Sequence, residues 1–159
     1  MRQPTIFISH GGGPCFWLDG PIASAFEGLK AYLGGLLASL PERPRAILMV
    51  SAHWEEKRVT LGAAKAPGMI LDYYGFPEHT YRLSYPAPGA PELAEKARGL
   101  LAAAGVETAL DAARGFDHGV FVPLLIVEPG ATIPILTLSL RDDLDPAFFS
   151  RIVTFNDQA

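Results

Sequence analysis

The stretch that decides the fold is Thr5–Pro14, which reads TIFISHGGGP. Its first five residues are mostly β-branched or aromatic, which is typical of a buried strand, and the run stops at His10 and three glycines. The pattern returns at 46–54, AILMVSAHW, where a second apolar run ends at His53 and predicts a second buried strand over 46–51. Because ligands bind open α/β sheets beyond the carboxyl ends of the strands, we expect His10 and His53 to be neighbours in space.

A helix is expected between these two strands, over 21–40. Pro21 suits the first turn of a helix, and apolar residues follow it at helical spacing as far as Leu40. A strand, a helix and a second strand in succession form a βαβ unit, whose strands are parallel. The sequence therefore predicts an α/β fold with a mainly parallel central sheet flanked by helices, and an active site at the C-terminal ends of the strands.

The rest of the chain continues the alternation of strands and helices. The segment 120–127 is ambiguous between a short helix and a strand, and Pro123 favours a helical turn. The other expected elements are strands at 58–63, 106–110 and 133–140, a helix at 91–104, and a helix that opens at Asp145 or Pro146.

Composition limits the class of protein. The chain has 159 residues, of which 49% are apolar, so we expect one α/β domain over 1–159 with a real core. Its net charge of −4 argues against a nucleic-acid partner. No apolar run approaches the roughly 20 residues of a membrane helix, so no membrane partner is expected. The single cysteine, Cys15, excludes an internal disulfide and is compatible with a cytoplasmic location.

Histidines are the strongest candidates for chemistry, because neutral imidazole is a common ligand for iron, zinc and copper. Of the four histidines, His10, His53 and His118 follow strands or lie in loops that lead to one sheet edge. His79 reads as an ordinary exposed histidine. Asp117, directly before His118, either orients a ligand or base or caps a helix that starts near Val120, and both readings stay open.

The segment 65–88 differs from the rest of the chain. It is rich in aromatic residues, proline and glycine and has no sustained period, which favours a functional loop. Two competing readings of the N-terminal stretch are weak. The run SHGGGP lacks the spacing of a phosphate-binding loop, and Cys15 is read as a buried residue rather than a nucleophile.

Five pieces of the chain together resemble a known family. In order they are PTIFISHGGGP, ILMVSAHWE, LDYYGFPEHTYRLSYPAPGAPELA, GFDHGVFVPLL and IPILTLSL. They resemble the class III extradiol ring-cleavage dioxygenases, and most of all the DODA-type (4,5-DOPA dioxygenase-like) branch of the LigB superfamily. The resemblance runs from about Pro4 to Asp145. The combination of SAHW, the GFP…YPAPG loop and DHG is far more specific than any one motif.

The resemblance implies a non-haem metal enzyme that opens a catechol-type aromatic ring with O2. His10 and His53 match the family's metal-binding histidines, and His118 matches an active-site histidine that contacts substrate or dioxygen. Iron(II) is expected for activity, and zinc(II) can occupy the same ligands. The aromatic loop around Tyr73 to Tyr85 is expected to form one wall of the substrate pocket. The residues expected to contact substrate are Tyr73, Phe76, Tyr81 and Asp117.

The chain departs from the family after its last predicted strand. Members of the family continue into further helices and strands, which carry another active-site histidine and the remaining metal ligand. We therefore expect the chain to lack the family's C-terminal portion. Two alternatives stay open: a zinc-dependent hydrolase using the same histidines, and a non-enzymatic domain that acts in a homo-oligomer or another complex through an exposed apolar face.

Overall fold

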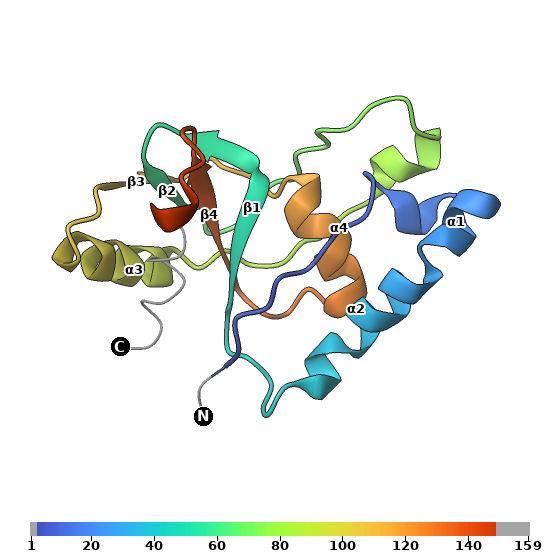
Figure 1. Cartoon of the computed structure of the whole chain (residues 1–159), viewed down its shortest axis with the longest axis horizontal. Helices are drawn as coiled ribbons and strands as arrows, with labels where there is room; N and C mark the ends of the chain where they lie inside the picture. The colour runs from blue at the N-terminus through green and yellow to red at the C-terminus, as the bar shows by residue number, and fades with distance from the viewer. Residues whose placement is uncertain (1–2, 149–159) are drawn as a thin grey trace.

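The computed structural model describes residues 3–148 and contains a four-stranded sheet flanked by helices (Figure 1). The strands are β1 (Ile47–Glu56), β2 (Val59–Gly62), β3 (Thr108–Asp111) and β4 (Ile135–Arg141). Their order across the sheet is β1-β4-β2-β3. β1 is parallel to β4 and β2 is parallel to β3, whereas β2 meets β4 antiparallel at Leu61 and Leu138. The predicted α/β fold with a mainly parallel sheet is confirmed.

Helices cover both faces of this sheet. α4 packs on β1, α2 packs on α4, and α3 packs on β2, β3 and β4 (Figure 1). The predicted helix over 21–40 is divided at Phe26, and the ambiguous segment after Asp117 is a helix. The helices are α1 (Pro21–Ala25), α2 (Glu27–Ser39), α3 (Pro91–Ala103) and α4 (His118–Val127), with 3-10 turns η1 (Cys15–Trp17) and η2 (Glu78–Arg82).

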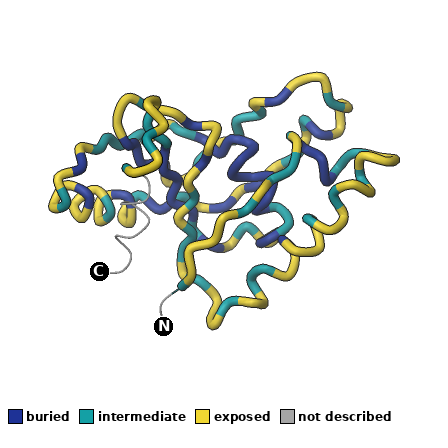
Figure 2. Tube along the Cα trace, in the orientation of Figure 1, coloured by how far each residue is buried: buried dark blue, intermediate teal, exposed yellow. Residues whose placement is uncertain are grey.

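The core lies on the two sides of β4, an inner strand whose first five residues are buried (Figure 2). Successive side chains of a strand point to opposite faces. Ile135 therefore joins the larger cluster beneath α4, whereas Leu136 and Leu138 join a second cluster beneath α3. Within residues 3–148, no helix combines the length and apolar composition that crossing a bilayer requires.

The N-terminal stretch differs from the prediction of a buried strand. Residues 5–9 are exposed or half-buried and belong to no strand, and the side chain of Phe7 is 97% exposed. The stretch runs beside β1, because Gln3 bonds the carbonyl of Glu42 at one end and His10 meets His53 at the other. Among the described residues, no backbone hydrogen bond joins residues 5–9 to β1. The β-branched composition favours an extended chain here, but without ladder partners it is not a strand.

β1 also differs from its prediction in burial and in length. One face packs on the core, but Leu48 is 54% exposed and Val50 is 38% exposed on the other face, so the strand is only half buried. The strand does not end before His53 but continues to Glu56. Its register with β4 shifts between Ser51 and Glu55, which is an irregularity of the β-bulge kind. His53 lies inside this irregular segment.

Candidate metal centre

Three histidines from distant parts of the sequence meet at one point. One ring nitrogen from each of His10, His53 and His118 lies within 4.8 Å of those of the other two. The Nε2 atoms of His10 and His53 are 2.9 Å apart. The ring centroids of His53 and His118 are 3.9 Å apart, and those of His10 and His118 are 4.9 Å apart. The expected proximity of His10 and His53 is confirmed.

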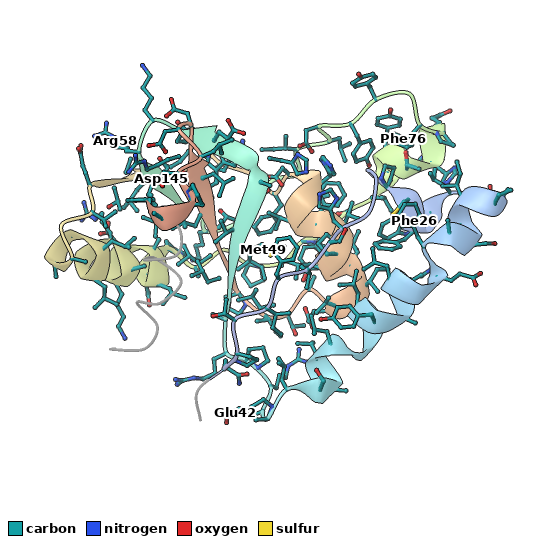
Figure 3. The ribbon with its side chains drawn as sticks, in the orientation of Figure 1. Phe26, Glu42, Met49, Arg58, Phe76 and Asp145 are labelled. Carbon is teal, nitrogen blue, oxygen red and sulfur yellow. The ribbon has the colours of Figure 1, made fainter. Side chains whose placement is uncertain are left out.

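The glycines after His10 let the chain turn tightly beside the aromatic loop. Gly11 and Gly13 both have positive φ, at 75° and 52°. A Cβ on Gly11 would lie 2.4 Å from the sulfur of Cys15, and one on Gly13 would lie 2.9 Å from the ring of Phe76. Figure 3 shows Phe26 and Phe76 near this turn. Gly11 and Gly13 therefore let the backbone pack closely against the side chains of Cys15 and Phe76, and this packing holds His10 in place.

His53 is held from behind by a short polar network. The hydroxyl of Ser51 accepts the backbone N–H of His53 at 3.2 Å and donates to Oδ1 of Asp117 at 2.6 Å. Trp54 is buried, with the guanidinium of Arg114 over its ring at 4.8 Å from the centroid. These contacts fix the irregular end of β1 and leave the imidazole of His53 at the surface of the cluster.

Asp117 joins the same network to the start of α4. It is 1% exposed and accepts the backbone N–H of Val120, so the predicted helix cap is confirmed. Its Oδ2 accepts a hydrogen bond from Arg114 at 2.8 Å. Both carboxylate oxygens of Asp117 therefore accept hydrogen bonds inside the protein. Among the described residues, their bonds go to Ser51, Arg114 and Val120 and not to the neighbouring histidine rings.

Gly119 allows α4 to begin directly against β1. A Cβ at this position would lie 2.7 Å from Cδ2 of His53 and 2.8 Å from Oγ of Ser51. Any side chain would push the helix away from the strand end. The short sequence Asp117–His118–Gly119 thus supplies the cap, the imidazole and the close approach in three consecutive residues.

Asp72 is a site residue that the sequence reasoning missed. Its Oδ1 accepts the backbone N–H of His118 at 2.9 Å and lies 2.9 Å from Nδ1 of the same residue, although the ring N–H direction is poorly aligned with that oxygen. Burial alone would raise the pKa of Asp72, but the contacts with His118 outweigh it and lower that pKa. An acidic residue in an aperiodic aromatic loop carries no pattern that would identify its partner.

The electrostatics of the cluster suit a cation. Burial, followed by the nearby imidazoles of His118 and His53, lowers the pKa of His10 to about 4. The ring of His10 is therefore neutral at pH 7 and carries a lone pair, as a metal ligand requires. Nδ1 of His10 is buried and has no hydrogen-bond partner among the described residues. The ring nitrogens of the three histidines lie close enough together to hold one divalent metal ion.

Three of the four residues expected to contact substrate lie together, and one of them, Tyr73, lies beside His118. The ring of Tyr73 is 6.0 Å from that of His118, and Phe76 and Tyr81 lie 5.6 Å and 5.3 Å from Tyr73. The hydroxyl of Tyr73 donates to the carbonyl of Thr80, and the hydroxyl of Tyr81 accepts the N–H of Phe76. These hydrogen bonds and ring contacts hold Tyr73, Phe76 and Tyr81 together as a cluster, called the aromatic wall below. His79 is outside the cluster, with Nε2 at 2.7 Å from the carbonyl of Trp17.

The chain is similar to several proteins that are named as dioxygenases. The chain is 40% identical to the dioxygenase tasH of Hapsidospora irregularis, over 94% of this chain and 47% of that protein. It is 39% identical to the 4,5-DOPA dioxygenase extradiol of Portulaca grandiflora, over 90% of this chain and 51% of that protein. The corresponding Escherichia coli protein is 38% identical over 92% of this chain and 50% of its own length. The chain therefore spans about half the length of these relatives.

A solved structure and a family model agree with these relatives. The crystal structure of an uncharacterised Escherichia coli K12 protein superposes with a TM-score of 0.58 and 34% identity, covering 76% of this chain and 43% of that one. The family model described as the catalytic LigB subunit of aromatic ring-opening dioxygenase matches residues 5–143. This range includes all three clustered histidines, Asp72 and the aromatic wall. The chain belongs to the LigB family of aromatic ring-opening dioxygenases.

Proposed function

We propose that this chain carries the metal centre of an extradiol dioxygenase that cleaves the ring of a catechol-type substrate with O2. The observation that carries the proposal is the meeting of His10, His53 and His118 within 4.8 Å, from three segments far apart in the sequence. Relatives named as 4,5-DOPA dioxygenases support the same chemistry.

We assign His10 and His53 as metal ligands and His118 as the catalytic histidine. A bound iron(II) would hold catechol and dioxygen side by side and stabilise the charge that develops between them. His118, beside both ligands, is suited to hydrogen-bond an oxygen of the catechol or of dioxygen. Tyr73, Phe76 and Tyr81 bury one face of the aromatic ring and exclude water from it. A direct contact between Asp117 and substrate would require one of its internal bonds to open.

The first test is a calorimetric titration of the metal-stripped chain with iron(II) under anaerobic conditions. We expect binding in the wild type and its loss in the His10→Ala and His53→Ala variants. His79→Ala is the matched control, because it removes an imidazole outside the cluster. Equal affinity in all four proteins would overturn the assignment of ligands.

The second test is turnover of a catechol by the iron-loaded chain, followed by oxygen uptake and by absorbance of the ring-opened product. Uptake that depends on both catechol and iron, and that His118→Ala reduces, supports the proposal. Zinc-loaded chain is the control, because zinc has no redox chemistry. Hydrolysis of an ester by the zinc form with no oxygen uptake by the iron form would favour a hydrolase instead.

A further inference from the structure

Asp72 makes the one contact between a carboxylate and an imidazole of the cluster in residues 3–148. It lies 46 residues before His118 and reaches it from the aromatic loop. The same oxygen, Oδ1, lies 2.9 Å from the backbone nitrogen and 2.9 Å from Nδ1 of His118. Both side chains are largely shielded from water, at 26% and 10% exposure. One carboxylate oxygen therefore contacts both the main chain and the ring of His118.

Asp117 is nearer to His118 in the sequence than Asp72, but it is not placed to orient the His118 ring. Asp117 precedes His118 directly, but its oxygens are engaged by Ser51, Arg114 and the N–H of Val120. Asp117 therefore stabilises α4 and the end of β1. Asp72 is the carboxylate that lies against the His118 ring and can orient it.

We propose that Asp72 is a positioning residue that holds His118 as the Nδ1–H tautomer and thereby keeps Nε2 as the unprotonated nitrogen at the cluster. A carboxylate next to one ring nitrogen favours the proton on that nitrogen and so selects the tautomer. A free histidine prefers the opposite tautomer, so the effect is measurable. The inference deepens the proposed function, since it concerns the same site.

Asp72 also lies next to the aromatic wall, so the residue that sets the His118 tautomer and the wall belong to one segment. Tyr73 follows Asp72 directly, and its ring packs 6.0 Å from that of His118. Its hydroxyl is bound to the carbonyl of Thr80, which is fully buried. The backbone segment that positions the aromatic wall therefore also positions the carboxylate of Asp72. Movement of this loop would displace the wall and release the His118 ring together.

The decisive measurement is the ring nitrogen spectrum of His118 in ¹⁵N-labelled, metal-free chain, at a pH well above that at which imidazole protonates. Comparison with His118→Ala assigns the signals. We expect Nδ1 to carry the proton in the wild type. A wild-type ring protonated on Nε2 overturns the proposal without the need for any variant. Because no metal is present, this result is independent of whether the chain binds iron or turns over catechol.

Asp72→Asn tests the cause of the tautomer preference. The asparagine oxygen can still accept the backbone N–H of His118, so the fold is retained while the charge is removed. We expect the ring to shift towards the Nε2–H tautomer, and catechol turnover to fall roughly 10- to 100-fold at unchanged iron content. Glu78→Gln is the matched control, because the carboxylate of Glu78 lies in the same loop but bonds Arg82, outside the histidine cluster. An Asp72→Asn spectrum identical to that of Glu78→Gln overturns the proposal.

Discussion

Replacing Asp117 by alanine should destabilise the whole domain, because this one carboxylate joins β1, Arg114 and α4. The side chain is 1% exposed, and its loss leaves the guanidinium of Arg114, itself 19% exposed, without its acidic partner. Removing one member of a buried ion pair costs about 3–5 kcal/mol, and losing a helix cap costs about 1 kcal/mol. We take about 3 kcal/mol as the smallest loss consistent with this network. That corresponds to a fall in melting temperature of roughly 6–12 °C for a domain of this size.

The assay is thermal and urea unfolding of Asp117→Ala, with two variants beside it. Asp117→Asn keeps an oxygen for Ser51 and for the cap but loses the charge, so its destabilisation should be intermediate. Glu107→Ala breaks an exposed ion pair with Arg58 and should cost less than about 1 kcal/mol. If Asp117→Ala lost no more stability than Glu107→Ala, the reasoning that places Asp117 at the centre of the network would be refuted.

Three further predictions follow from the same geometry. Gly119→Ala should weaken iron binding at least tenfold in calorimetry, because the added Cβ meets the ring of His53 at 2.7 Å; unchanged affinity would show that α4 can move away freely. Stability should fall on acidification between about pH 6.5 and pH 4, since His10 titrates at about 4 in the folded chain and near 6.5 when unfolded, and its neutral form is the one that folding favours. Urea titrations should show a smaller fall in this window for His10→Ala, and an equal fall would contradict the assignment. Tyr85→Phe should raise stability by about 1 kcal/mol, because the hydroxyl of Tyr85 is buried without a hydrogen-bond partner among the described residues; a loss of stability would reveal a bond that this geometry lacks.

The sequence predicted correctly that His10 and His53 lie close together, but it did not predict the backbone conformation that carries each of them. Two apolar runs ending at His10 and His53 were sufficient to place both at one edge of a parallel sheet. However, His10 arrives on an unpaired extended segment, and His53 lies inside an irregular part of β1. Strand propensity reports that a chain prefers to be extended, whereas pairing depends on partners elsewhere in the sequence.

The supporting residues were only partly predictable. Asp117 could be foreseen as a helix cap, because capping depends on residues within one turn. The contact of Asp72 with His118 and the need for glycine at position 119 depend on segments that meet only after folding. No local pattern encodes such contacts, and only the three-dimensional arrangement identifies them.

The outer side of β1 has no hydrogen-bonded strand partner among residues 3–148, and this has a consequence for how the molecule behaves in concentrated solution. An outer strand with free backbone groups can template the addition of a strand from another molecule, and proteins usually counter this with charged residues. The run from Ile47 to Ala52 contains no charge. Leu48, Val50 and Phe7 are exposed nearby. Colloidal stability, rather than chemistry, is therefore the property that substitutions at Leu48 and Val50 should change most.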